Sequence, residues 1–340
     1  MRILIVAPSW LGDAVMMGSL LARLKARAPA PRIAVLAPLA LEDVVRRMPG
    51  VDEVIENPFA HGALRLGGRW RLGRALAGRF EAAIVLPQSF KSALVPWFAG
   101  VPRRTGFIGE ARHLLLNDAR PLDEARLPRL VDRFCLLAEP PGAAAPADAP
   151  APRLGVSAGA ADAARTRFGL VTGRPAVAFC VGAEYGPAKR WPAVHFAALA
   201  TIAAAHGMDV WLLGSKRDAG IGAEVAVAAS GAVVDLVGRT SLGDAIELLS
   251  GAAAVVSNDS GLMHVAAALG RPLVALYGSS SPAFTPPLSP AAAILTEALA
   301  CSPCFERRCP LGHLKCLNDL APQRVWQALQ AQLGQTVALA

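Results

Sequence analysis

The chain has 340 residues, which is enough for about two domains that each bury a core of their own. Hydrophobic residues make up 54% of it, which excludes a disordered protein, and charges and helix breakers interrupt every long apolar stretch, which excludes a membrane-spanning helix. The formal net charge is +8, and residues 1–150 contribute most of it, with 20 Lys and Arg against 14 Asp and Glu.

The basic first half points to an anionic partner. Nucleic acid is disfavoured, because neither a basic helix nor a run of base-stacking aromatic residues accompanies the charges. An anionic small molecule, or a phosphorylated acceptor at a membrane surface, fits them as well, and the plain alternative is an ordinary arginine-rich surface. The basic residues concerned are Arg65, Arg69, Arg71, Arg74, Lys91, Arg103, Arg104 and Arg112.

Short apolar runs alternate with helical patterns along the whole chain. The first run follows Met1 without a small-residue cleavage site, so it reads as a strand and not as a signal peptide, and we expect a cytoplasmic protein. A segment rich in Pro and Ala, residues 139–152, interrupts the alternation and reads as a linker or a surface loop. The predicted strands are Ile3–Ala7, Ile33–Ala37, Val54–Glu56 and Ala82–Leu86 before it, and Ala176–Val181, Val210–Leu213, Val233–Val237, Ala252–Val256 and Leu273–Tyr277 after it.

Continuous apolar strands separated by helices predict parallel sheets that are covered on both faces. We therefore predict an α/β protein of two Rossmann-like domains, residues 1–165 and 172–320, whose sheets face each other across a cleft. A C-terminal helix within 321–340 should pack back toward the first domain. Ligands of such folds bind beyond the carboxyl ends of the strands, so we expect the functional residues in the loops that follow the strands.

The loop after the first strand, Pro8–Ala14, carries one carboxylate, Asp13, beside the flexible Gly12. It lacks the glycine spacing of a dinucleotide site and the Lys-Ser/Thr of a P-loop. Asp13 is either the N-cap of the next helix or a general base. A helix N-terminus lowers the pKa of a carboxylate and weakens it as a base, whereas burial acts the other way.

Two loops near the start of the second half of the chain also carry charged residues. Gly182–Pro192 places Lys189 beside Arg190 before a helix, which suits a diphosphate, although a solvated pair of charges is the alternative. Gly214–Asp218 ends in a carboxylate that either accepts from a ribose diol or caps the following helix.

The run Ser257–His264 directly follows an apolar strand and opens a helix of small residues. A strand that ends in such a turn presents free backbone N–H groups and the positive end of the helix dipole, which together suit a phosphate. The alternative is that Asn258 or Asp259 only caps the helix, and that His264 is a core residue.

These segments resemble the ADP-heptose:lipopolysaccharide heptosyltransferases of glycosyltransferase family 9, which are inverting, metal-independent GT-B enzymes, and within them the type II branch. The resemblance covers nearly the whole chain in the expected order. Gln88 departs from the family pattern, which has Asn before Ser-Phe-Lys. The matching segments are Ala7–Asp13, Ser89–Pro96, Gly182–Pro192, Asn258–Leu269, Arg271–Gly278 and Phe284–Leu288.

The resemblance implies roles for individual residues. Asp13 matches the catalytic base and Lys189 the lysine that binds the donor diphosphate. The donor side is expected to comprise Gly182, Glu184, Tyr185, Lys189, Arg190, Ser215, Asp218, Thr240, Asp259, Ser260, Gly261 and His264. The acceptor side is expected to comprise Ser9, Trp10, Gly12, Lys91 and Arg104.

The resemblance also implies a reaction. L-glycero-D-manno-heptose would pass from ADP-heptose to the first heptose of the lipopolysaccharide inner core, carried on Kdo2-lipid A, with no cofactor required for catalysis. The acceptor would be met at the inner leaflet by a peripheral contact, without a transmembrane segment and without nucleic acid.

Four cysteines cluster near the C-terminus, outside these motifs. In a cytosolic protein such a cluster favours a structural zinc site over disulfides, although the spacing fits no standard finger, and free thiols are the alternative. The cysteines are Cys301, Cys304, Cys309 and Cys316.

The residues alone leave three other functions open. A type I paralogue would share the donor loops but use another acceptor. A nucleotide-sugar epimerase would need no acceptor and no basic first half. A non-catalytic nucleotide-sugar or RNA-binding protein would have no use for Asp13.

Overall fold

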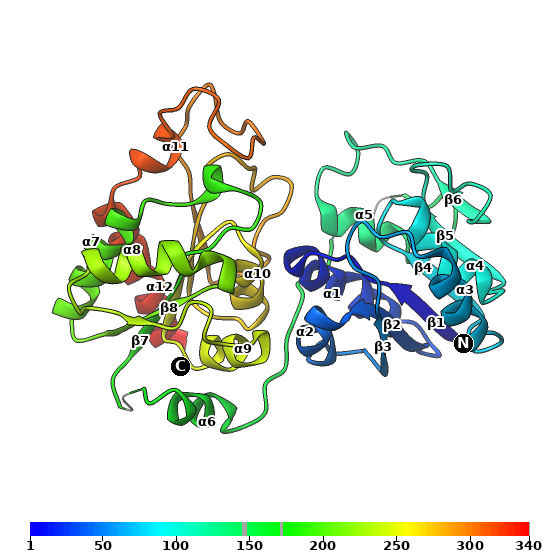
Figure 1. The fold of residues 1–340 in the computed structure, drawn as a ribbon, viewed down its shortest axis with the longest axis horizontal. Coiled ribbons are helices and arrows are strands. Elements are labelled where there is room, and N and C mark those ends of the chain that lie inside the picture. Colours follow the sequence, from blue (N-terminus) through cyan, green and yellow to red (C-terminus); the bar gives the residue numbers. More distant parts are fainter. Residues whose placement is uncertain (145–147, 171–172, 340) are drawn as a thin grey trace. The chain divides into compact units, whose positions relative to one another are not determined.

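The computed structural model of the chain describes residues 1–144, 148–170 and 173–339 (Figure 1). It divides into two compact units, Met1–Pro152 and Arg153–Ala340. Residues 145–147 of the predicted linker, and residues 172 and 340 at predicted domain limits, lie outside the described part.

The described residues of the first unit form a six-stranded parallel sheet in the order β3-β2-β1-β4-β5-β6. Its central strand β1 is buried from its second residue onward, as a strand covered on both faces must be. The elements are β1 (Arg2–Val6), α1 (Leu11–Lys25), β2 (Arg32–Pro38), η1 (Leu39–Leu41), α2 (Glu42–Arg46), β3 (Glu53–Asn57), α3 (Leu66–Ala75), β4 (Ala82–Val85), η2 (Phe90–Ala93), α4 (Leu94–Phe98), β5 (Arg103–Phe107), β6 (Asp118–Arg120) and α5 (Leu130–Leu136).

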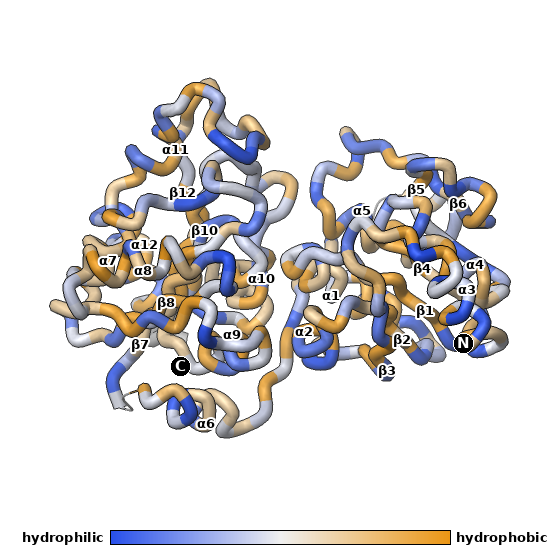
Figure 2. Tube along the Cα trace, viewed as in Figure 1, coloured by the Kyte–Doolittle hydropathy of each residue, from blue (hydrophilic) through white to orange (hydrophobic). Residues whose placement is uncertain are grey.

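The second unit repeats this plan, with a six-stranded parallel sheet in the order β12-β11-β10-β7-β8-β9 among its described residues. Figure 2 shows apolar segments running along its sheet. The elements are α6 (Ala160–Arg167), β7 (Ala176–Cys180), η3 (Pro187–Lys189), α7 (Ala193–Ala205), β8 (Asp209–Leu213), η4 (Lys216–Asp218), α8 (Ala219–Ala228), β9 (Val234–Asp235), α9 (Leu242–Ser250), β10 (Ala254–Asn258), α10 (Gly261–Ala268), β11 (Leu273–Leu276), β12 (Ala292–Leu295), α11 (Lys315–Asn318) and α12 (Pro322–Leu339).

The predicted α/β class and the two Rossmann-like units are confirmed. Each strand that the apolar runs predicted is present, with small shifts at its ends. The prediction lacked β5, β6 and β12, because β5 opens with two arginines, β6 has only three residues, and β12 is a partly exposed edge strand.

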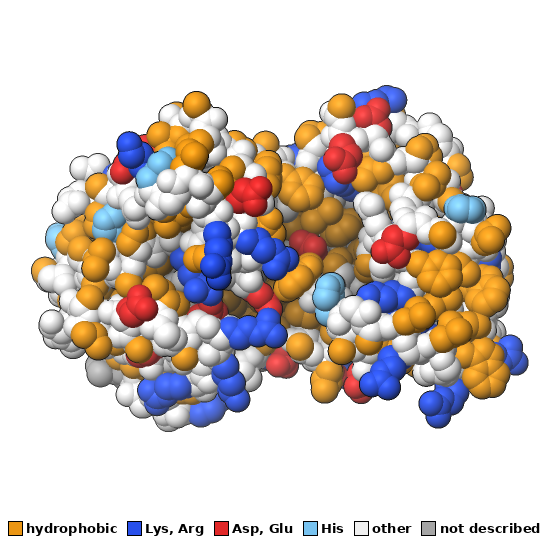
Figure 3. All heavy atoms as spheres, turned by 45° about the horizontal axis from the view of Figure 1, so that its top comes forward, with side chains coloured by type: hydrophobic (Ala, Val, Ile, Leu, Met, Phe, Trp, Pro, Cys, Tyr) orange, Lys and Arg blue, Asp and Glu red, His pale blue; other side chains and the backbone are white. Residues whose placement is uncertain are grey.

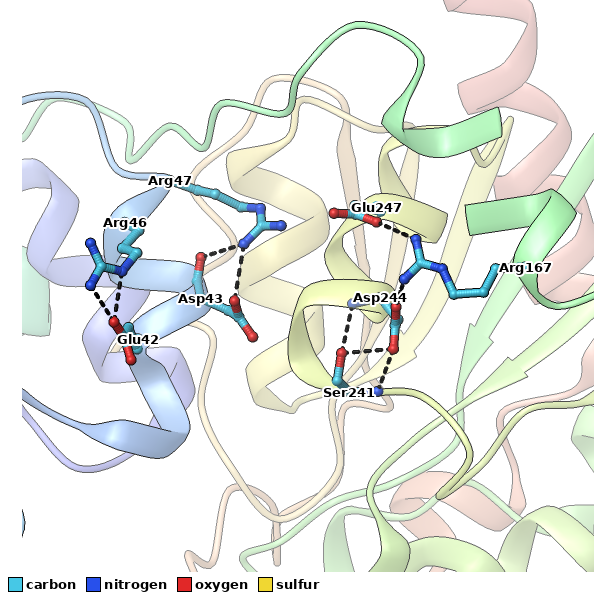
Figure 4. A network of polar contacts seen from close by, with 8 residues as sticks. All are labelled: Glu42, Asp43, Arg46, Arg47, Arg167, Ser241, Asp244 and Glu247. Atoms are coloured by element: carbon cyan, nitrogen blue, oxygen red, sulfur yellow. Dashed lines mark hydrogen bonds and ion pairs between the residues drawn. The ribbon is translucent and has the colours of Figure 1, made fainter. Parts of the chain in front are cut away.

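The division between the units falls before α6, earlier than the predicted limit at residue 165. Arg165 donates to the carbonyl of Gly251, and Arg167 pairs with Asp244 and Glu247 of α9 (Figure 4). Ser241 caps α9 in the same network, through a reciprocal pair of hydrogen bonds with Asp244. These contacts attach α6 to the second unit.

Helix α12 packs on the sheet of the second unit. Val325, Trp326 and Leu329 belong to the buried core that also contains strand residues of β7 and β10. The helix thereby completes one face of this unit, and its expected packing toward residues 1–165 stays a prediction.

Candidate active site

A buried ion pair stands at the carboxyl end of the second sheet. Asp259 directly follows β10, and its Oδ2 lies 2.5 Å from Nζ of Lys189, which ends η3. The Asp259 side chain is 5% exposed, and the Ser280 hydroxyl donates to the same oxygen. Two residues of the predicted donor site, 70 positions apart in the chain, therefore meet in one contact.

Helix α10 begins immediately beside this pair. Its N-cap is Ser260, which makes no side-chain cap hydrogen bond, and the helix itself starts at Gly261. Backbone N–H groups of an uncapped first turn are donors for an anion, and the helix dipole favours negative charge at the same place. The alternative that Asn258 or Asp259 caps this helix is wrong.

Asn258 has a different task, which the sequence alone did not reveal. Its side chain is fully buried; Oδ1 accepts from the backbone N–H of Trp191 at 2.9 Å, and Nδ2 donates to the carbonyl of Val181 at 2.8 Å. The Trp191 indole in turn donates to the carbonyl of Leu320. Asn258 therefore fixes both ends of the loop that carries Lys189 and Arg190.

His264 lies in the middle of α10 and is 6% exposed. Burial lowers its pKa to about 4; the nearby Asp259 carboxylate opposes this shift, and the Lys189 ammonium adds to it. The imidazole is therefore neutral at physiological pH, as a core histidine would be. Its electrostatic coupling to both members of the ion pair nevertheless places it at the site.

Tyr185 joins the donor loop to the cysteine-containing segment. Its hydroxyl donates to the carbonyl of Phe305 at 2.5 Å, and its ring faces Lys189 Nζ at 4.9 Å and the Arg307 guanidinium at 5.2 Å. The backbone N–H of Ala188 also donates to the carbonyl of Arg307. The segment around residue 305 therefore supports the lysine that the site uses.

Asp218 is fully engaged by protein groups. Its Oδ2 accepts from the hydroxyl and the backbone N–H of Ser215, at 2.6 and 3.0 Å, and its Oδ1 faces Arg190 at 3.4 Å. Gly182 leaves the room for this carboxylate, since any side chain there would overlap it. These bonds form a capping box with Ser215 at η4, whereas the Asp218 side chain makes no cap for α8, and its contact with a ribose stays a prediction.

Arg190 retains an unused donor. Its Nε is buried and has no hydrogen-bond partner in the described part of the protein. Of the other predicted donor residues, Glu184 pairs with Arg217 at the exposed rim, and Thr240 precedes Ser241 at the start of α9. The Thr240 loop lies beside the Ser215 loop, because the N–H of Gly238 donates to the carbonyl of Gly214.

The first unit has a cavity of about 440 Å³ at the carboxyl end of its sheet. Asp13 lines it from the first turn of α1, where Trp10 is the N-cap, so the N-cap alternative for Asp13 is wrong. Ser9, Trp10 and Lys91 line it too, whereas Gly12 lies beside it in the same turn of α1. The expected acceptor residues other than Arg104 thus gather around one space.

A buried arginine, Arg69, lines this cavity. Arg69 donates to the carbonyls of Ala63, Leu64 and Lys91 and stacks on the Phe59 ring at 4.4 Å. It is only 5% exposed, so the alternative of an ordinary arginine-rich surface does not account for it.

Arg112 is fully buried, so the same alternative does not account for it either. It donates to the carbonyls of Phe107 and Pro87 and to the Ser92 hydroxyl. Burial lowers its pKa to about 10, and Glu110 opposes this shift. Arg112 holds the loop that carries Gln88, Ser89 and Lys91, so both arginines serve the site by positioning its backbone.

Arg104 does not belong to the cavity. It is the second residue of β5, so it lies toward the amino end of the sheet, opposite the edge where ligands bind. Its guanidinium donates to the carbonyls of Val101 and Leu115, and partial burial lowers its pKa. The structure therefore does not bring Arg104 together with the other expected acceptor residues.

The zinc site expected at the four clustered cysteines stays a prediction. The six cysteines of the chain are free thiols, and no group of three or more His, Cys, Asp or Glu in the described residues is placed to hold a metal ion. Cys316 is buried on α11, whereas the Cys309 sulfur accepts from the N–H of Leu314, which lowers the pKa of its thiol.

In the described part of the chain, every helix is too short or too polar to cross a bilayer.

Comparisons with known proteins agree with this geometry. Residues 69–315 match the model of glycosyltransferase family 9 (heptosyltransferase). The chain is 45% identical to lipopolysaccharide heptosyltransferase 2 of Escherichia coli, over 99% of this chain and 100% of that protein, and 41% identical to lipooligosaccharide heptosyltransferase 2 of Haemophilus ducreyi, over 98% and 100%.

Solved structures give the same answer for the fold. The E. coli ADP-heptose lps heptosyltransferase II superposes with a TM-score of 0.90 at 44% identity, covering 99% of both chains. A family 9 glycosyltransferase from Veillonella parvula reaches 0.85 at 23% identity, over 98% of this chain and 97% of that one, which supports the shared GT-B fold alone. The chain belongs to glycosyltransferase family 9, the heptosyltransferases, and is a glycosyltransferase.

Proposed function

We propose that this enzyme transfers heptose from ADP-heptose to the first heptose of the lipopolysaccharide inner core, with inversion at the sugar. The observation that carries the proposal is the Lys189–Asp259 pair beside the uncapped start of α10. The full-length relatives favour the type II reaction, because the similarity to a type 1 heptosyltransferase of Pseudomonas aeruginosa covers only 47% of the chain.

The donor half of the site would neutralise the leaving diphosphate. Lys189 supplies a point charge, Arg190 has a buried Nε without a partner, and the first turn of α10 offers backbone donors. ADP departs as an anion, so its departure requires compensation of charge more than it requires a proton. We propose that these groups do this without a metal ion.

The acceptor half would supply the base. Asp13 lines the cavity of the first unit from the first turn of α1. An inverting displacement needs a base that removes the acceptor proton as the new bond forms. We propose Asp13 for this task, with Ser9, Trp10 and Lys91 holding the acceptor sugar.

The acceptor would be the heptose of a Kdo2-lipid A precursor at the inner leaflet, which the protein would meet as a peripheral enzyme. The basic bias of residues 1–150 suits the phosphates of such an acceptor.

The decisive experiment measures ADP release by purified protein given ADP-heptose. Three samples are compared: a Kdo2-lipid A acceptor with one heptose, the same acceptor without heptose, and no acceptor. Release only with the heptose-bearing acceptor supports the proposal. Release with the heptose-free acceptor would assign the type I reaction instead, and release that needs no acceptor would overturn the transferase proposal.

A further inference from the structure

Helix α3 exposes large apolar side chains where a surface helix usually carries polar ones. Leu66 and Trp70 are 52% and 51% exposed, and with Arg74 they recur at every fourth residue, so they share one side of the helix. Arg69 and Gly73 of the same helix are buried. A solvent-facing Trp beside a Leu indicates a surface that meets a partner.

The neighbouring elements extend this apolar surface. Helix α4 packs on α3 at Gly73, where an added Cβ would come within 2.5 Å of the Phe98 Cβ. Trp97 on α4 is 43% exposed, and Leu64, just before α3, is 49% exposed. We call Leu64, Leu66, Trp70 and Trp97 the α3–α4 surface. Figure 3 shows apolar side chains gathered with Lys and Arg side chains on this part of the first unit.

The charge around the α3–α4 surface has one sign. Residues 57–80 include five arginines and not one Asp or Glu. Three of them, Arg65, Arg71 and Arg74, are exposed and have no carboxylate partner among the residues that the structure describes. A partner for this surface must therefore combine negative charge with an apolar interior.

An anionic bilayer has both properties. Trp suits the headgroup region because its ring is apolar and its N–H is polar, Leu enters the acyl boundary, and Arg pairs with lipid phosphates. A second copy of this chain fits less well, because a two-fold contact through this surface would bring the same unpaired arginines together.

The position of the surface also suits a bilayer. A second cavity at its edge is lined by Arg65, Leu66 and Arg71, and it shares Phe59 and Ala60 with the cavity that holds Asp13. A membrane at this face would present the glycan of a lipid-anchored acceptor to that cavity. This last step rests on the proposed function, whereas the composition of the surface does not.

We infer that the α3–α4 surface docks the enzyme on anionic lipid, with Trp70 and Trp97 inserted at the headgroup level and Arg65, Arg71 and Arg74 facing lipid phosphates. The docked face belongs to the first unit and borders the acceptor cavity.

The test is co-sedimentation of the full chain with vesicles of phosphatidylcholine, with and without phosphatidylglycerol. Binding should require the anionic lipid and weaken as salt is added. Neutralising each arginine to Gln should lower the partition coefficient about fivefold, so the triple variant should lose about a hundredfold. The variant W70S/W97S should lose binding too, whereas the control Leu114→Ser, at an 81% exposed position of the same unit, should bind like the parent.

Several outcomes would overturn the inference: equal binding to neutral vesicles, vesicle binding by W70S/W97S that matches the parent, or a dimer in analytical ultracentrifugation that this variant abolishes. Transfer to a deacylated, water-soluble acceptor separates the two proposals. W70S/W97S should keep that activity, and its retention shows that the variant is folded. A parent protein that transfers heptose but ignores vesicles refutes docking alone, and one that binds vesicles without transfer refutes the proposed function alone.

Discussion

The ammonium of Lys189 lies 2.5 Å from Asp259, a carboxylate that is itself almost fully buried. Removing one member of such a pair strongly destabilises the protein, because the remaining charge is buried without a partner and without water. In the free enzyme Asp259 holds the lysine at the start of α10. Under the proposed function, an arriving diphosphate would share the lysine without a large movement of the loop.

Replacing Lys189 with Met should weaken ADP binding about ten- to a hundredfold, since one charge-assisted contact to the diphosphate is lost. Isothermal titration calorimetry measures this directly. Lys189→Arg should recover part of the affinity, and an unchanged dissociation constant for the Met variant would remove Lys189 from the donor site.

The Asp13→Asn variant should lose about a hundred- to ten-thousandfold in kcat while its ADP affinity stays at the parent value. Asp43→Asn is the matched control, because Asp43 occupies the first turn of α2 in the same unit. Turnover of the Asp13 variant near that of the control would refute the assignment of the base.

Asn258→Asp should destabilise the second unit by about 1–3 kcal/mol, because the carbonyl of Val181 loses its buried donor while Trp191 keeps its acceptor. Asn258→Leu should cost more, since both partners are then unsatisfied. Urea unfolding measures both variants. Equal stability of the two would show that only one of the two hydrogen bonds matters.

Arg69→Met should raise the KM for the acceptor about ten- to a hundredfold and leave ADP binding unchanged, because the guanidinium holds the carbonyls of Ala63, Leu64 and Lys91 around the cavity. Arg69→Lys should not rescue the variant, since an ammonium lacks the planar fork that reaches all three carbonyls. Full rescue by Lys would show that charge alone is needed at this position.

The stability of the second unit should fall between pH 6.5 and about 4 through His264. Burial lowers the pKa of this residue to about 4, so within this window the unfolded chain binds a proton that the folded chain does not. Below pH 4, the loss of unfolding free energy that is due to His264 approaches about 3 kcal/mol. Protonation of the neighbouring carboxylates adds its own effect. The difference in unfolding free energy between His264→Gln and the parent, followed from pH 7.5 to 4.5, should therefore change with pH, and a difference that stays constant would refute this role of His264.

The sequence by itself determined the fold class, because a parallel strand that is buried on both faces consists of consecutive apolar residues, and such a run is visible in the sequence. Strands β1, β7 and β10 follow this rule. Strand β5 does not, since its first two residues are arginines at the amino edge of the sheet, where they reach solvent and loop carbonyls. The polar turn Asp259–Gly261 between an apolar strand and a small-residue helix could also be located from the sequence, and its use for a phosphate stays a prediction.

Only the tertiary structure decided what each polar residue does there. Arg65, Arg69, Arg104 and Arg112 are the same amino acid in one basic half of the chain, yet they take different places in the fold. Arg65 faces solvent, Arg69 is buried in the lining of the first unit's cavity, Arg112 is buried among loop carbonyls, and Arg104 is bound at the amino edge of the sheet. The carbonyl of Lys91, which accepts from Arg69, lies 22 residues away in the sequence. The backbone N–H of Trp191, which donates to Asn258, lies 67 residues away. A guanidinium or an amide takes its role from whichever unsatisfied groups the fold brings within hydrogen-bond reach, and those distances do not exist until the chain is folded.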